Sequence, residues 1–163
     1  MNPHHLCHLR QKTKLMSKKT TVKNIFVEGA ISPQKIADSI AKHQSKTGIG
    51  AHDIFLGQVR ADEVDGKTVT AIDFTAQQEM ANQVCHEIKE SVFEKWPVHC
   101  LHIYHSIGRV AAGELCIFVF VSAAHRTTVF KALPYLVNEI KARVPIFGRE
   151  IFTDETHQWK VNT

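Results

Sequence analysis

Residues 114–124 read ELCIFVFVSAA and are followed directly by His125 and Arg126. This apolar run is far shorter than a membrane span and predicts a buried strand. A helix is expected immediately after it, over 127–143, because apolar side chains recur there at helical spacing. Its buried positions are predicted to be Val129, Phe130, Leu133, Leu136, Val137 and Ile140. Pro134 lies inside this segment, so we expect the helix to kink or its hydrogen-bond ladder to break locally.

Apolar periodicity and turn residues divide the rest of the chain into short elements on both sides of this strand. Strands are predicted over five further segments: 21–29, 48–60, 68–76, 98–108 and, as a terminal hairpin, 150–161. Two more helices are predicted, over 33–45 and 78–96. Ser32 is the expected N-cap of the first, with Pro33 in its first turn. Pro97 ends the second.

The polar segment 61–67 is expected to be a turn, and its Asp65-Gly66 pair is typical of a hairpin. Three pairs of consecutive strands are joined by hairpin-length connections, which favours antiparallel pairing. We therefore predict an α+β fold, with a mostly antiparallel sheet and three main helices.

The composition limits the class of protein. The 163 residues are 44% hydrophobic and 22% charged, which is ordinary for a globular chain and excludes a mainly disordered one. Five cations and no acid lie in the first twenty residues: Arg10, Lys12, Lys14, Lys18 and Lys19. From Thr21 onward the charges nearly cancel, so we expect no nucleic-acid partner. We expect a disordered basic extension over 1–20, or a start at Met16, and a single domain over 21–163.

The N-terminal segment also bears on location and metal binding. It lacks the apolar run of a secretory signal, whereas its basic, acid-free composition also fits an organelle transit peptide. Its HHLCH motif, residues 4–8, offers metal ligands, but without a second ligand cluster we expect no metal site. No stretch approaches eighteen consecutive apolar residues, so no membrane span is expected.

The four cysteines show no CxxC spacing: Cys7, Cys85, Cys100 and Cys116. Three of them fall in apolar periodic segments, where a free cysteine behaves as a small buried hydrophobe. This pattern favours a reduced, cytoplasmic protein.

Cations stand at the ends of several predicted elements: Arg60, His125, Arg126, Lys141 and Arg149. The last two flank an apolar turn expected over 144–147. Backbone amides at a helix N-terminus beside an arginine make a ready anion site, so a shared pocket for an anionic ligand is one interpretation. The other is an arginine in solvent at a strand end, a capping histidine, and a lysine favoured by the helix dipole. Sequence spacing does not choose between them.

Six short motifs are similar to the catalytic (large) subunit family of molybdopterin synthase: GAHDIFLGQVR (50–60), EMA (79–81), HSIGRVAAGE (105–114), VFVSAAHR (119–126), IKARVPIFGRE (140–150) and QWK (158–160). They follow the family's order over about 22–161. The resemblance implies an α/β hammerhead fold and a homodimer core. It also implies a small ubiquitin-like sulfur-carrier subunit docked at each end, which gives a heterotetramer.

The reaction implied by this resemblance is a sulfur transfer in molybdenum cofactor biosynthesis. Cyclic pyranopterin monophosphate (precursor Z) becomes molybdopterin when two sulfurs, carried as thiocarboxylates on the Gly-Gly tail of the small subunit, build the dithiolene. The cyclic phosphate is opened in the same conversion. No cofactor is implied for the catalytic subunit itself.

The resemblance also assigns roles to residues of this chain. Lys141 matches the family's essential lysine and is expected to act as a general acid or base, or to stabilise anionic intermediates. The phosphate is expected to bind Arg60, His125 and Arg126, with part of the pocket coming from the neighbouring subunit. Two segments match substrate contacts: Gln58-Val59-Arg60 and Gly148-Arg149-Glu150.

This chain departs from the family pattern at several positions. Phe147-Gly148-Arg149-Glu150 stands where the family commonly has Trp-Lys-Lys/Arg-Glu, so a second lysine is absent at Gly148. Arg149 is the nearest cation in sequence and is expected to act only electrostatically. Thr75, Gln77 and Ser106 also replace common family residues.

These departures leave an alternative open, a non-catalytic homologue that only binds the sulfur carrier. A nucleotide-binding domain is a third possibility. It would need a glycine-rich phosphate loop, and neither GxGxxG nor GxxxxGK[ST] occurs in the chain.

Overall fold

The computed structural model describes residues 21–161, and the expectations for residues 1–20, including HHLCH and Met16, lie outside the described residues. The described chain contains three helices: α1 (Pro33–His43), α2 (Gln78–Lys95) and α3 (Arg126–Arg143). Its strands are β1 (Phe26–Glu28), β2 (Ala51–Gln58), β3 (Glu63–Val64), β4 (Lys67–Ala76), β5 (Val98–Ala111), β6 (Leu115–Ala123), β7 (Ile146–Phe152) and β8 (His157–Trp159).

The strands form one sheet in the order β2-β6-β5-β4-β7-β8, with β3 paired to β4. Every pairing is antiparallel except that of β1, which runs parallel to β5. The predicted α+β class, the mostly antiparallel sheet and the three helices are confirmed.

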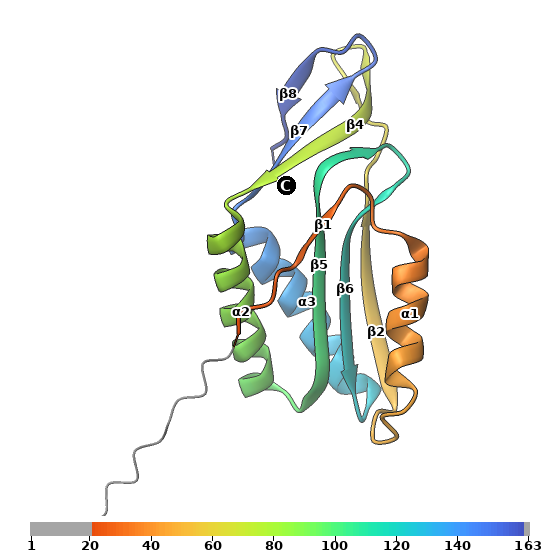
Figure 1. Cartoon of the computed structure of the whole chain (residues 1–163), viewed down its shortest axis with the longest axis vertical. Helices are drawn as coiled ribbons and strands as arrows, with labels where there is room; N and C mark the ends of the chain where they lie inside the picture. Colours follow the sequence, from red (N-terminus) through yellow and green to blue (C-terminus); the bar gives the residue numbers. More distant parts are fainter. Residues whose placement is uncertain (1–20, 162–163) are drawn as a thin grey trace, which may run out of the picture.

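The long strand β5 joins two parts of the sheet. Its residues 98–105 pair with β6, and its residues 108–111 pair with β4. Figure 1 shows β4, β7 and β8 lying obliquely across one end of the longer β2–β6–β5 part, with α3 behind it, α2 at the edge beside β5 and α1 at the opposite edge beside β2. A cavity lies at the junction between these two parts of the sheet.

β6 is apolar at nearly every position because both of its faces are covered. Ile117, Val119 and Val121 belong to the core beneath α2 and α3. Phe118 and Phe120 belong to a second core that includes residues of α1 and β1. A strand buried on both sides loses the alternation of apolar and polar residues, which explains the unbroken run in the sequence.

The third helix contains Pro134, as predicted, but the structure differs from the prediction at Phe130 and at the turn that follows the helix. α3 is a single helix that continues through Pro134, so the proline removes one amide donor without ending the element. Phe130, predicted to be buried, is 60% exposed. The apolar turn expected over 144–147 is shorter, because β7 begins at Ile146 and pairs with β4. Pairing with a distant strand outweighed the local turn pattern.

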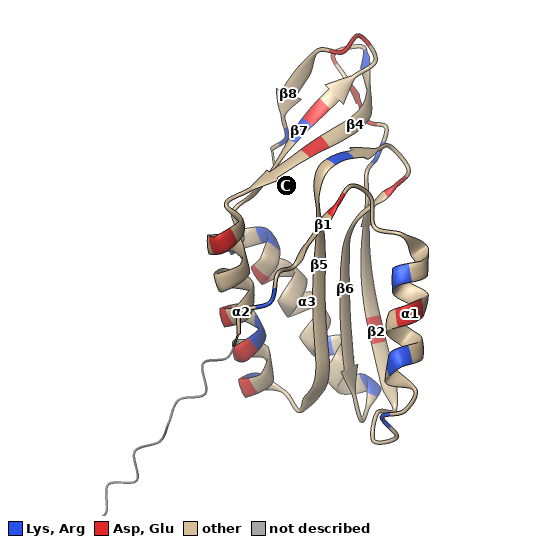
Figure 2. Cartoon of the chain, in the orientation of Figure 1, with Lys and Arg blue, Asp and Glu red and all other residues tan. Residues whose placement is uncertain are grey.

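No helix in the described range is long and apolar enough to cross a membrane. Among the same residues, no group of three or more His, Cys, Asp or Glu side chains is placed to hold a metal ion. Charges of both signs are interspersed along the three helices (Figure 2).

Candidate active site

A cavity of about 390 Å³ lies at the junction of the two parts of the sheet, beside the C-terminal end of α3. Residues from β2, β4, β5, β6, β7 and α3 contribute to it. Its apolar wall includes Phe55, Ile72, Phe74, Ile117, Ile140, Val144 and Ile146. Its polar wall includes Gln58, Arg60, His105, Cys116, Lys141 and Lys160. An apolar pocket with a few convergent polar groups is the usual form of a small-molecule site.

The structure brings together five of the residues expected from the sequence: Gln58, Val59, Arg60, Lys141 and Gly148. Lys141 lies in the last turn of α3, next to Ile140, which is buried in the core. Arg60 follows β2 and is highly exposed, where its guanidinium donates to Asp62 at 2.9 Å. An exposed pair of this kind is weak, so Arg60 remains available to an anionic ligand at the mouth of the cavity.

His125 and Arg126 lie at the other end of α3 from Lys141. Lys141 follows Arg126 by fifteen positions, a rise of roughly 22 Å along the helix at about 1.5 Å per residue. Figure 1 shows the two ends of α3 far apart, one beside the upper strands and one near the lower turns of the sheet. Within one chain, these two residues and Lys141 do not share a pocket.

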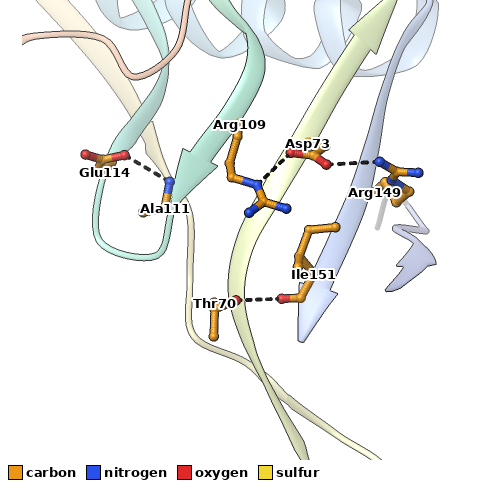
Figure 3. A network of polar contacts seen from close by, with 7 residues as sticks. All are labelled: Thr70, Asp73, Arg109, Ala111, Glu114, Arg149 and Ile151. Atoms are coloured by element: carbon orange, nitrogen blue, oxygen red, sulfur yellow. Dashed lines mark hydrogen bonds and ion pairs between the residues drawn. The ribbon is translucent and has the colours of Figure 1, made fainter. Parts of the chain in front are cut away.

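Arg149 also lies away from the cavity, because successive side chains on a strand point to opposite faces. Its guanidinium donates to Asp73 Oδ2 at 3.0 Å, and Arg109 Nε donates to Asp73 Oδ1 at 3.2 Å (Figure 3). Partial burial alone would raise the pKa of Asp73, but the hydrogen bonds from Arg149 and Arg109 hold that pKa below its usual value. Arg149 therefore ties β7 to β4.

Lys160 lines the cavity and ends the QWK motif, but it is not among the site residues expected from the sequence. Its Nζ donates to Glu150 Oε1 at 3.1 Å, and the Glu150 side chain is only 8% exposed. Gln158 Nε2 donates to the other oxygen of Glu150 at 2.9 Å. Glu150, expected to contact substrate, thus holds Lys160 in place. The register of the β7–β8 hairpin is the signal that could have predicted that Lys160 lies in the cavity.

Two further polar groups of the cavity are neutral at physiological pH. Burial lowers the pKa of His105 to about 4, although a hydrogen bond to the Ser106 carbonyl opposes the shift and the nearby Lys141 adds to it. His105 Nδ1 lies 2.8 Å from that carbonyl oxygen and must carry the proton, which leaves Nε2 as an acceptor. Burial raises the pKa of the Cys116 thiol, while Lys141 and Lys160 act to lower it.

Comparison with known proteins agrees with the motifs. The family model described as MoaE protein matches residues 27–143. The chain is 39% identical over 115 residues to the molybdopterin synthase catalytic subunit of Pyrococcus abyssi, which covers 71% of this chain and 76% of that protein. It is 34% identical over 113 residues to the Rattus norvegicus protein of the same name, covering 69% of this chain and 56% of the relative. The chain thus spans little more than half the length of this mammalian relative.

Solved structures share the fold. Molybdopterin synthase from Staphylococcus aureus superposes with a TM-score of 0.73 at 26% identity, over 86% of this chain and 99% of that one. A complex of subunits 1 and 2 of the molybdopterin-converting factor from Helicobacter pylori gives a TM-score of 0.70 at 16% identity, over 82% and 87% of the two chains, and shows the fold alone. The match over 27–143, the catalytic-subunit relatives and the shared architecture together establish that this chain belongs to the MoaE protein family.

Proposed function

We propose that this chain is the catalytic subunit of a molybdopterin synthase. It converts cyclic pyranopterin monophosphate to molybdopterin with sulfur from the thiocarboxylated tail of a small ubiquitin-like carrier. The observation that carries the proposal is the cavity in which Lys141 meets the segment Gln58–Arg60. Both parts come from motifs that resemble the family.

The cavity has the size and charge that this substrate requires. Its volume of about 390 Å³ is within the range of small-molecule pockets. Its charged lining is cationic, with Arg60, Lys141 and Lys160, and the substrate carries a phosphate. The apolar wall, which includes Phe74 and Ile72, suits the flat pterin ring system.

We assign Lys141 a direct part in the sulfur transfer. The thiocarboxylate sulfur attacks an electrophilic carbon of the substrate and forms a carbon–sulfur bond as an oxygen substituent leaves, which gives a thioester between the substrate and the tail. Water then attacks the tail carbonyl through an anionic tetrahedral species, which leaves the sulfur on the substrate and releases the tail as a carboxylate. An ammonium beside that carbonyl stabilises the developing negative charge and can donate a proton. The surrounding apolar wall strengthens that interaction by excluding water.

The proposal includes the assembly. His125 and Arg126 lie too far from Lys141 to serve the same cavity within one chain, so they reach a phosphate only in a homodimer that places them against the neighbouring cavity. One small subunit per cavity then gives a heterotetramer. We place this assembly in the cytoplasm, and we assign no cofactor to this subunit.

A reconstituted reaction tests the proposed function. The full chain is incubated with precursor Z and a thiocarboxylated small subunit, and the dithiolene product is measured after conversion to a fluorescent derivative. Product formation that depends on both the chain and the thiocarboxylate supports the proposal. The alternative of a non-catalytic homologue, motivated by Gly148, predicts a stable complex with the small subunit and no product.

A further inference from the structure

The geometry points to Lys160 as a further cationic group of the active-site cavity, beside Lys141 and Arg60. There it binds an anionic oxygen of the substrate or of the acyl intermediate, a role that residue 148, a glycine, has no side chain to take. This inference rests on the proposed function. It differs from the expectation drawn from the sequence, in which Arg149 was the nearest substitute.

The register of the terminal hairpin puts Lys160 beside Gly148. In the β7–β8 ladder, Arg149 is opposite Trp159 and Glu150 is opposite Gln158. The ladder continues by one more pair, because the Lys160 amide donates to the Gly148 carbonyl at 2.8 Å. Opposite residues of an antiparallel pair project from the same face, so Lys160 shares the cavity face with Gly148.

The space next to Gly148 is already occupied. A Cβ atom built on Gly148 would lie 3.7 Å from Lys160 Cβ, 3.5 Å from Phe74 Cε1 and only 3.0 Å from Ile72 Cγ2. Gly148 does not have a positive φ, so contacts and not backbone strain limit a side chain here. A lysine side chain reaches this part of the cavity from the neighbouring residue Lys160, whose Cβ is within van der Waals contact distance of the position that a Cβ at residue 148 would take.

The ammonium of Lys160 is fixed in position by an ion pair with Glu150. Glu150, nearly buried, takes one of its three donors at 3.1 Å and is itself fixed by Gln158. Within residues 21–161, Glu150 is the one acceptor bonded to this ammonium, which leaves its other donors for an anionic ligand. Lys160 and Lys141 both line the cavity, and both lie near enough to Cys116 to act to lower the pKa of its thiol.

Activity measurements separate a substrate-facing lysine from a surface one. Lys160→Met keeps the length of the side chain and removes its charge, and it should lower product formation about 10- to 100-fold, the effect of one charge-assisted hydrogen bond. Lys160→Arg should retain more activity than Lys160→Met. Lys67→Met is the matched control, since Lys67 is a half-exposed lysine of the same end of the sheet that pairs with Asp154, and it should leave activity unchanged. Turnover by Lys160→Met within about twofold of the wild type would overturn the inference.

A background without the buried carboxylate separates this role from a purely structural one. If Lys160 only neutralises Glu150, its replacement will have no effect on activity once Glu150→Gln has removed that charge. If Lys160 acts on the ligand, Glu150→Gln/Lys160→Met will be less active than Glu150→Gln alone, while both have similar melting temperatures. Loss of the Lys160 effect in this background counts against the inference.

The pH dependence of Cys116 alkylation gives a readout that does not depend on turnover. A charge next to the cavity lowers the pKa of this thiol, so Lys160→Met should move the alkylation profile by iodoacetamide, followed on the Cys116 peptide by mass spectrometry, to higher pH. Lys67→Met should not move it. An unchanged profile in Lys160→Met would place the ammonium outside the cavity. A wild-type chain that makes no dithiolene would instead count against the proposed function, with the profile still deciding where Lys160 lies.

Discussion

Lys141 and Arg126 belong to the same helix, yet only Lys141 lines the cavity. On β7 the same contrast holds between Gly148, which faces the cavity, and Arg149, which bonds Asp73 on the other side of the sheet. In the sequence, the first pair are two cations of one helix and the second pair are adjacent residues of one strand. Their different surroundings determine which of them can meet a ligand.

Replacement of Lys141 should remove activity without removing the fold. Lys141→Ala is expected to lower product formation about 100-fold or more, because a cation that stabilises transition-state charge is lost. Lys131→Ala, at an exposed position of the same helix, is the control and should leave activity and melting temperature unchanged. A folded Lys141→Ala protein with normal turnover would refute the catalytic role.

His105 predicts a dependence of stability on pH. Its pKa of about 4 in the folded chain is below the ordinary value of 6.5, so the unfolded chain binds more protons between these pH values. The free energy of unfolding should therefore fall as the pH is lowered from about 6.5 to about 4. His102, whose pKa is also lowered to about 4 by burial, adds a contribution of the same sign.

His105→Asn should reduce this slope by up to about one bound proton in denaturant titrations across the pH range. Ile103→Val, a buried and non-titrating change on the same strand, should lower stability while keeping the slope. If both variants show the slope of the wild type, the group responsible lies elsewhere.

At the scale of elements, three neighbouring strands are joined by one carboxylate. Asp73 on β4 is opposite Arg109 on β5 and Arg149 on β7, and it accepts a hydrogen bond from each (Figure 3). These strands connect the two parts of the sheet above the cavity. The network therefore bears on the shape of the site although none of its side chains lines it.

Asp73→Asn should lower the free energy of unfolding by about 1 kcal/mol. The substitution keeps the shape of the side chain but removes the negative charge that pairs with both arginines. The loss should shrink with falling pH. The pKa of Asp73 is lowered in the folded chain, so its contribution is present above the unfolded pKa and disappears as the pH falls through the folded one. Asp38→Asn, on the exposed side of α1, is the control for a surface aspartate and should have a smaller effect. If both variants lose the same free energy of unfolding, the Asp73 network stabilises the fold no more than an exposed aspartate does.

At the scale of the whole molecule, the separation of Arg126 from Lys141 predicts active sites shared between chains. Arg126→Ala and Lys141→Ala proteins should each be weakly active, whereas their co-expression should restore activity. A mixed dimer contains one site with both changes and one site with neither. Random pairing gives half mixed dimers, so about a quarter of wild-type activity is expected in a two-fold assembly. No recovery in isolated mixed dimers would mean that the sites are not shared.

Local chemistry was sufficient to predict most elements and part of the site. Ser32 caps α1 by accepting from the Gln34 amide at 3.2 Å, and Asp65 and Gly66 both take the positive φ of a tight hairpin turn. The unbroken run over 114–124 became the doubly covered strand β6. Lys141 and Gln58–Arg60 were expected in the site because they lie in continuous sequence motifs that resemble the family.

The tertiary structure alone decided which side chains meet. β7 begins at Ile146 and not near 150 because β4 is available as its partner, and that pairing turns Arg149 toward Asp73. Lys160 enters the cavity because the β7–β8 register places it opposite Gly148. A shift of one residue in a strand pairing exchanges its two faces, so the sequence determines the alternation along each strand but not the face that a given residue joins. Contacts with strands distant in the chain supply that choice, and they bring Lys160 to the same cavity as Lys141.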